Sequence, residues 1–206
     1  MVDTFKVVLI GDMAVGKTCI IAQFTTGEFD PDSVTSSTVN FRSKTIEFLD
    51  GKSIKFNIWD TMGQEKYRAM AQIFYKDARI VILVYDISNQ KSFEAMKDYW
   101  YQQVKEKGPK EIILAVAANK SDLYELRQVD DEEGEKFAKS IGAIFASTSA
   151  RNDTGITSLF ENIGRMVLDP NFDFWKKEKL EKSPSFIMNS KTIKEGKEKQ
   201  EEKSCC

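Results

Sequence analysis

Strand-like apolar runs that alternate with helix-like segments are the feature that most constrains the fold. The runs cover residues 5–10, 40–49, 53–60, 79–86, 111–119 and 143–148. Most of them contain few polar residues, which is typical of strands buried on both faces of a parallel sheet. Helices are predicted over residues 17–25, 66–76, 92–107, 131–141 and 155–168. This alternation predicts an α/β fold with helices on both faces of the sheet.

The second and third runs are separated by a turn signal, Asp50–Gly51. An Asp-Gly pair between two strand-like runs is typical of a β-hairpin. One hairpin strand is therefore expected to run antiparallel in an otherwise parallel sheet.

The composition changes near residue 170. Residues 171–206 are rich in Lys, Glu and Ser, and their apolar residues are too sparse to form a core. We therefore expect a compact domain over residues 1–170 and a flexible tail over residues 171–206.

Composition also excludes several classes of function. The chain of 206 residues has a net charge of −2, so no basic field favours nucleic acid. It contains no histidine, which excludes histidine-based catalysis and His-ligated metals. No apolar run approaches the ~20 residues of a membrane span, and the run near the N-terminus is too short for a signal peptide. Three cysteines, two of them adjacent, indicate a reduced, cytosolic protein without a disulfide framework.

The segment GDMAVGKT, residues 11–18, lies between the first strand and the first helix. It matches the phosphate-binding pattern G-x-x-x-x-G-K-[ST], in which backbone N–H groups surround phosphate oxygens. Lys17 is expected to reach the β- and γ-phosphates, and the Thr18 hydroxyl to bind Mg²⁺. The predicted phosphate-binding residues are Met13, Ala14, Val15, Gly16, Lys17, Thr18 and Cys19. An ordinary glycine-rich turn is the alternative.

The segment WDTMGQE, residues 59–65, ends the third run. Asp60 at a strand end beside a phosphate-binding loop is placed to hold the metal, usually through water. Gly63 leaves its N–H accessible to a terminal phosphate, and Gln64 could orient an attacking water. A solvated strand end is the alternative for Asp60.

The segment NKSD, residues 119–122, follows the fifth run. The Asp122 carboxylate can accept two hydrogen bonds from guanine, a donor pair that adenine lacks. Asn119 can brace the loop, and the stem of Lys120 can lie over the base. The segment TSAR after the sixth run would bring small residues and N–H groups to the guanine oxygen through Ser149, Ala150 and Arg151.

In this order, and with a terminal Cys–Cys, these motifs resemble those of Ras-superfamily small GTPases and specifically of the Rab family. The resemblance covers most of residues 5–168. It implies a six-stranded sheet with five helices, bound GTP or GDP with Mg²⁺, and a switch that hydrolyses GTP slowly without an activating protein. It also implies a role in vesicle traffic.

The resemblance assigns a metal ligand in the first switch. Ungapped alignment from GDMAVGKT places Ser36 at the family's Mg²⁺-binding threonine. A shift by two residues would place Thr38 there instead, and a polar loop without metal contact is a third alternative. Phe29 resembles the family's aromatic that packs edge-on against guanine; a core anchor is the alternative.

Two methionines depart from the family pattern. Met62 stands where the family usually has alanine, and Met13 where a small residue is common. Their bulk near the γ-phosphate could slow hydrolysis or hinder an arginine finger. They motivate a second hypothesis, a nucleotide-binding interaction protein with negligible turnover. A P-loop ATPase or nucleotide kinase is a third hypothesis, which NKSD disfavours.

The resemblance also implies partners. Phe41, Trp59 and Phe74 align with an aromatic triad that contacts effector proteins, with interstrand packing as the alternative. Cys205 and Cys206 would carry two geranylgeranyl groups, which anchor a protein more firmly than one. An exchange factor, a GTPase-activating protein and a chaperone that binds the prenyl groups are further expected partners. The implied location is the cytoplasmic face of endomembranes, with a cytosolic pool.

Overall fold

A computed structural model of the chain describes residues 2–30, 40–61 and 71–181. The chain divides after Pro170 into two units, and the second begins at Asn171. Among the described residues, no helix is both long and apolar enough to cross a membrane.

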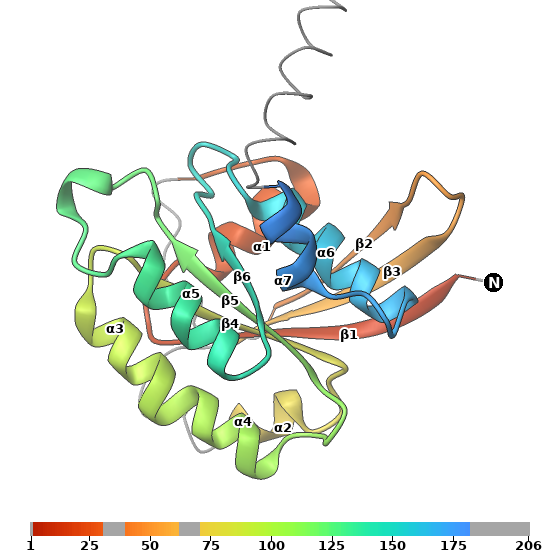
Figure 1. Cartoon of the computed structure of the whole chain (residues 1–206), viewed down its shortest axis with the longest axis horizontal. Coiled ribbons are helices and arrows are strands. Elements are labelled where there is room, and N and C mark those ends of the chain that lie inside the picture. Colours follow the sequence, from red (N-terminus) through yellow and green to blue (C-terminus); the bar gives the residue numbers. More distant parts are fainter. Residues whose placement is uncertain (1, 31–39, 62–70, 182–206) are drawn as a thin grey trace, which may run out of the picture. The chain divides into compact units, whose positions relative to one another are not determined.

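The first unit contains a six-stranded sheet with the order β2-β3-β1-β4-β5-β6 (Figure 1). Its strands are β1 (Asp3–Ile10), β2 (Asn40–Glu47), β3 (Ser53–Asp60), β4 (Ile80–Asp86), β5 (Ile113–Asn119) and β6 (Ile144–Ser147). All neighbouring strands run parallel except β2 and β3, which pair antiparallel. The predicted α/β fold with one antiparallel hairpin is thereby confirmed.

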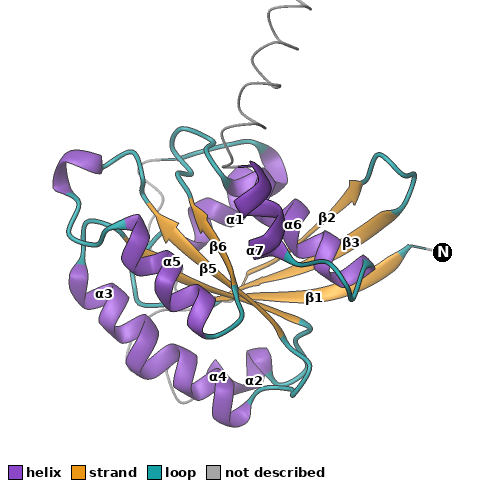
Figure 2. Ribbon diagram, viewed as in Figure 1, coloured by secondary structure: helices purple, strands orange, loops and turns teal. Residues whose placement is uncertain are grey.

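Each of the five predicted helical segments contains a helix of the structure (Figure 2). The helices are α1 (Lys17–Thr26), α2 (Ala71–Tyr75), α3 (Gln90–Ala95), the π-helix η2 (Met96–Tyr101), α4 (Gln102–Lys107), the 3₁₀ helix η3 (Tyr124–Leu126), α5 (Asp131–Ser140), α6 (Ile156–Leu168) and α7 (Phe174–Glu181). The start of the predicted segment 66–76 lies outside the described residues. The single helix expected over 92–107 is interrupted by η2.

Helix α7 was not predicted, since the sequence indicated a flexible tail from residue 171. The Asp173 carboxylate accepts a hydrogen bond from the Lys176 N–H at 3.0 Å and so caps the first turn. Lys and Glu residues follow in α7, and both are good helix formers. Local capping and propensity therefore account for this helix.

Helices cover both faces of the sheet. Phe56 and Ile58 alternate with polar residues in β3 and lie on the face covered by α1 and α6, where the Phe24 and Phe160 rings stack at 3.7 Å. Tyr85 lies on the opposite face and contacts Phe93 of α3 at 4.8 Å between ring centroids. Strand β4 is buried along its whole length, as its apolar sequence predicts.

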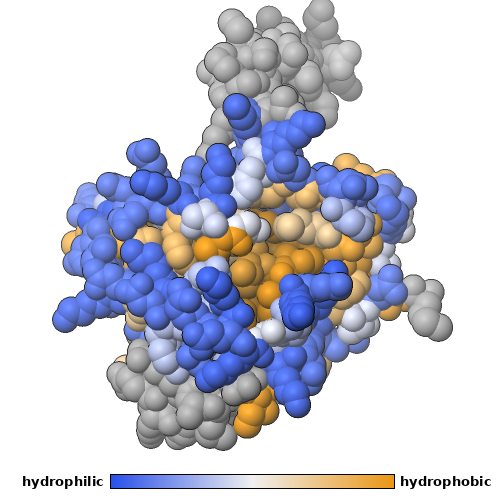
Figure 3. Space-filling view, turned by 60° about the horizontal axis from the view of Figure 1, so that its bottom comes forward, coloured by the Kyte–Doolittle hydropathy of each residue, from blue (hydrophilic) through white to orange (hydrophobic). Residues whose placement is uncertain are grey.

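Some apolar side chains stay accessible. Figure 3 shows hydrophobic residues gathered at the centre of one face and bordered by hydrophilic ones. Phe41 in β2 and Ile73 in α2 are 53% and 66% exposed. Exposed apolar side chains of this size are candidates for partner contact.

The parallel strands β1, β4, β5 and β6 all end at the same edge of the sheet. Asp86 and Asn119 terminate β4 and β5, and β3 ends on the same side at Asp60. Ligands of open α/β sheets bind outside the carboxyl ends of the strands. The fold therefore gathers the predicted motifs at one edge.

Candidate functional site

The loop between β1 and α1 depends on two glycines. Gly11 has φ +152°, and a Cβ there would lie 2.2 Å from the Val84 carbonyl oxygen. Gly16 has φ +94°, and a Cβ there would lie 2.3 Å from Asn119 Nδ2. Both positions therefore exclude a side chain on steric grounds as well as by their backbone conformation. The loop has the compact form that a phosphate-binding turn requires.

Lys17 is the first residue of α1, and its ammonium turns back over this loop. Its Nζ donates to the carbonyl oxygens of Gly11 at 2.9 Å and Asp12 at 2.7 Å. Only 5% of its surface is exposed, and burial lowers the pKa of Lys17 to about 8, against the opposing effect of the Asp60 and Asp12 charges. A buried ammonium held above a glycine turn is well placed for phosphate oxygens.

Thr18 and Asp60 form a second polar pair. The Thr18 hydroxyl donates to Asp60 Oδ2 at 2.7 Å, although the residues are 42 positions apart. Asp60 is 2% exposed. Mg²⁺ in nucleotide sites takes few protein ligands, together with phosphates and waters, so one hydroxyl and one carboxylate side by side fit it. No group of three or more acidic or cysteine side chains suited to a metal occurs in the described parts of the chain.

Asn119 connects three of the predicted motifs. Its Nδ2 donates to the Val15 carbonyl oxygen at 2.8 Å, and its Oδ1 accepts a hydrogen bond from the Thr148 hydroxyl at 3.2 Å. Asn119 and Thr148 are almost completely buried. One amide therefore ties the phosphate loop to the two segments that are expected to surround the base.

Lys120 and Asp122 flank the expected base position. Lys120 has φ +64°, and its Nζ lies 2.7 Å from Asp86 Oδ2. Asp122 Oδ1 accepts a hydrogen bond from the Ser149 hydroxyl at 2.6 Å, and the carboxylate is half-buried. The hydroxyl fixes the orientation of the carboxylate without neutralising it, so it remains able to accept from guanine.

The loop after β6 is stabilised by hydrogen bonds between its own residues. Ser149 and Thr154 exchange backbone hydrogen bonds of 2.9 and 3.0 Å. Ser149 and Ala150 are buried, whereas Arg151 is exposed. Gly155 closes the loop, because a Cβ there would lie 2.1 Å from the Ser147 carbonyl oxygen.

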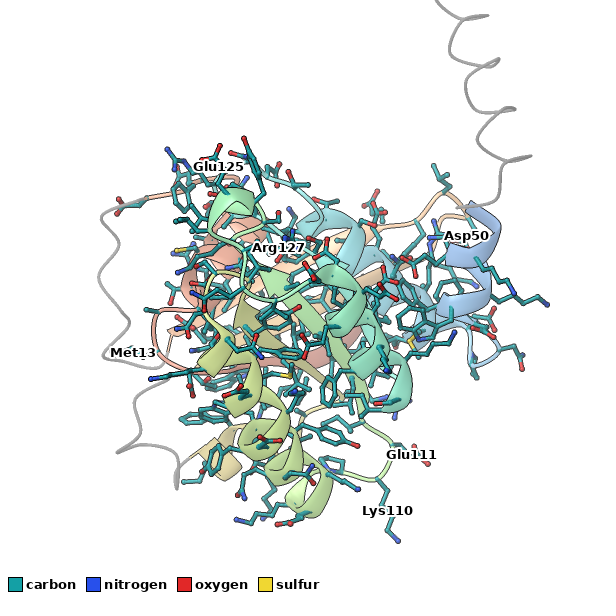
Figure 4. The ribbon with its side chains drawn as sticks, turned by 60° about the vertical axis from the view of Figure 1, so that its left-hand side comes forward. Met13, Asp50, Lys110, Glu111, Glu125 and Arg127 are labelled. Carbon is teal, nitrogen blue, oxygen red and sulfur yellow. The ribbon has the colours of Figure 1, made fainter. Side chains whose placement is uncertain are left out.

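Two of the other predicted residues, Met13 and Phe29, are at least partly exposed, and several others lie outside the described residues. Met13, a residue of the phosphate loop, is 51% exposed, and Figure 4 places it at the edge of the described structure. Phe29 is half-buried beyond the end of α1. Ser36, Thr38, Met62, Gly63, Gln64, Cys205 and Cys206 lie outside the described residues.

The predicted effector surface is described in part. The Phe41 and Trp59 rings pack edge to face, with centroids 5.4 Å apart on adjacent strands. Phe74 is half-buried in α2. Interstrand packing and exposure therefore coexist at Phe41.

Sequence reasoning missed Asp12, Asp86 and Trp100. Asp12 accepts a hydrogen bond through Oδ1 from Trp100 Nε1 at 2.8 Å, and Asp86 pairs with Lys120. Asp86 could have been found, because it ends a buried strand at the edge where NKSD lies. Trp100 carried no comparable signal, because it is 88 residues from Asp12.

Comparisons with known proteins agree with this geometry. A model of the Ras family matches residues 6–169. Three similar relatives are "Ras-related protein Rab-8B" of Pongo abelii, "Ras-related protein Rab-22A" of Homo sapiens and "Ras-related protein Rab-31" of Homo sapiens, each 39% identical. The alignments cover 80%, 79% and 81% of this chain and 78%, 82% and 85% of the relatives. The chain therefore belongs to the Rab family of Ras-superfamily small GTPases.

Proposed function

We propose that this Rab-family GTPase is a molecular switch of membrane traffic that binds GTP and GDP with Mg²⁺ at the edge of the sheet. The observation that carries the proposal is the pair of hydrogen bonds made by the Asn119 side chain. Its amide group forms one hydrogen bond with the phosphate loop and one with Thr148. Asp122 would select guanine, Lys17 would hold the β- and γ-phosphates, and Thr18 and Asp60 would hold the metal.

The proposed reaction is an in-line attack of water on the γ-phosphorus of GTP. Lys17 and the backbone N–H groups of the loop would stabilise charge on the phosphate oxygens. Gln64 would orient the water, and Gly63 would offer its N–H to the γ-phosphate. Since the protein supplies positioning rather than a strong base, turnover should be slow without an activating protein.

The proposed partners follow from the family and the exposed aromatic pair. Effector proteins would contact Phe41 and Trp59, whose packed rings leave Phe41 53% exposed. Cys205 and Cys206 would carry geranylgeranyl groups that attach the protein to the cytoplasmic face of endomembranes. Exchange factors, activating proteins and a chaperone that shields the prenyl groups would control the cycle.

Single-turnover hydrolysis tests the proposed reaction. Full-length protein loaded with GTP and Mg²⁺ should release phosphate slowly, and Gln64→Ala should reduce the rate by about tenfold or more. Gln72→Ala, on the next helix, serves as the matched control. Equal rates for Gln64→Ala and the unaltered protein would contradict the role of Gln64.

One observation favours a second candidate, a nucleotide-binding interaction protein with negligible turnover. Met13 is 51% exposed in the phosphate loop, where its flexible side chain could block an activating residue. Under this candidate, phosphate release would be undetectable in the unaltered protein. It would appear in Met13→Gly and Met62→Ala.

A further inference from the structure

A hydrogen bond connects the phosphate loop to the helical segment that follows β4. Trp100 Nε1 donates to Asp12 Oδ1 at 2.8 Å, and Trp100 itself is completely buried. Because a buried indole N–H without a partner would be costly, this bond fixes the indole and the carboxylate together. Hydrogen bonds to an ionised acceptor are stronger than neutral ones.

Asp12 also contacts Lys17, so the bond with Trp100 helps to position the lysine. Its carboxylate accepts from Trp100, while its main-chain carbonyl accepts from Lys17 Nζ at 2.7 Å. The Asp12 charge also favours the charged form of the buried lysine. A displacement of Asp12 would therefore move a main-chain acceptor of the lysine and remove a nearby negative charge.

Trp100 lies in an unusual helical turn. Residues Met96–Tyr101 form a π-helix between α3 and α4, and this segment packs against β4. Such turns are rare and are found mostly at functional sites. Met96 and Trp100 are the buried residues of the turn, and Trp100 is the one that reaches the phosphate loop.

We infer that Trp100 is a positioning residue of the phosphate site, which holds Asp12 and through it the Lys17 ammonium in the geometry that binds the nucleotide's β-phosphate. This inference rests on the proposed function, because it takes Lys17 as the phosphate-binding residue. Trp100 does not touch the nucleotide in this scheme.

The test compares GDP with GMP, both with Mg²⁺, on the nucleotide-free full chain. GMP lacks the β-phosphate, so the GDP-over-GMP preference reports on the phosphate loop, and GMP affinity reports on the base site. In Trp100→Phe the preference should fall about tenfold, with GMP affinity unchanged. Met96→Ala is the matched control: it should lower the unfolding temperature through lost packing but keep the preference.

The outcomes separate the two claims. If the unaltered protein shows no GDP-over-GMP preference, the proposed phosphate site is wrong. If that preference exists and a folded Trp100→Phe keeps it within twofold, the positioning role is wrong. If Trp100→Phe does not fold, Asp12→Ala decides, because it removes the same bond and should reduce the preference.

A double substitution tests the route through Asp12. Asp12→Ala and Trp100→Phe together should reduce the preference hardly more than Asp12→Ala alone, since both remove one bond. Additive reductions would overturn the inference that Trp100 acts through Asp12.

Discussion

At residue scale, Asp122 combines partial burial with a fixed orientation. Its Oδ1 accepts from the Ser149 hydroxyl at 2.6 Å, which leaves lone pairs on the carboxylate for the N1–H and 2-amino groups of guanine. In Asp122→Asn, an amide donor would face one of those two guanine donors.

We therefore expect GDP affinity to fall about 100-fold or more in Asp122→Asn. Xanthosine diphosphate should gain affinity, because its C2 oxygen can accept from the new amide. Competition binding measures both ligands. Ser149→Ala, which keeps the carboxylate, should show a smaller loss, and an unchanged GDP affinity in Asp122→Asn would contradict guanine selection by this side chain.

A second residue, Tyr85, affects stability. Its hydroxyl is buried and has no hydrogen-bond partner among the described residues, and a Cβ added at Gly134 would lie 2.4 Å from it. Burial, more than the nearby Asp131 charge, raises the pKa of Tyr85 above its ordinary value. Removing an unsatisfied hydroxyl is expected to stabilise a protein.

Tyr85→Phe should raise the free energy of unfolding by about 1 kcal/mol at pH 7. Because the folded-state pKa is raised, the neutral phenol's contribution is present below the unfolded-state pKa and is lost as pH rises above it. The advantage of the variant should therefore grow above about pH 10. Urea unfolding of both proteins at pH 7 and above about pH 10 measures the difference in the free energy of unfolding. Lower stability of the variant at pH 7 would contradict the prediction.

Several residues of the candidate site belong to short local motifs, so their place in the site could be predicted from the sequence. Lys17, Thr18, Asn119 and Asp122 are such residues. Asp86 could have been inferred from its place at the end of a buried strand, although its partner Lys120 is 34 positions away in the chain. Trp100 could not, because its contact with Asp12 joins residues 88 positions apart. Its position follows from the π-helical turn, which no short pattern specifies.

At the scale of elements, the C-terminal end of α1 is stabilised by side chains of strand β2. Its last turn contains no basic residue, but Lys44 of β2 donates to the Phe24 carbonyl oxygen, and its ammonium lies 4.6 Å from the Phe24 ring centroid. Arg42 donates to the Thr25 hydroxyl at 3.4 Å. A positive charge at a helix C-terminus and over an aromatic ring is stabilising.

Lys44→Met should lower the free energy of unfolding by about 1 kcal/mol and speed amide exchange at the end of α1. Lys55→Met is the matched control, because Lys55 lies on the other face of the adjacent β3. Urea unfolding and hydrogen exchange provide the measurements. Equal effects of the two substitutions would show that Lys44 does not act through α1.

Elements were predictable where one interaction dominates. Burial alternates along β3 and is complete along β4, and the order of apolar residues in the sequence follows this burial. The predicted bounds of both strands therefore agree with the structure within a residue. The π-helical turn was not predictable, since a helical pattern over 92–107 does not reveal a local change of hydrogen bonding. Helix α7 was missed because its composition resembles that of a solvated tail.

At the scale of the whole molecule, all described site residues lie in the unit that ends at Pro170. The sheet order brings their strand ends together within that unit. Nucleotide binding should therefore not require the second unit.

A chain that ends at Pro170 should bind GDP with Mg²⁺ as tightly as the full chain, within about twofold. It should also lose the proposed membrane attachment in cells, because it lacks the proposed lipidation sites Cys205 and Cys206. Calorimetry and cell fractionation measure the two effects. A GDP affinity reduced tenfold would show that the second unit contributes to the site.

The most direct test of this assignment is calorimetry of the nucleotide-free full chain with GDP and with ADP, each with Mg²⁺. Asn119 holds the phosphate loop and the Thr148 segment together, and we propose that Asp122, held by Ser149, distinguishes the purines. The account predicts that GDP binds at least about 100-fold more tightly than ADP. Equal affinities, or binding of neither nucleotide by folded protein, would contradict it.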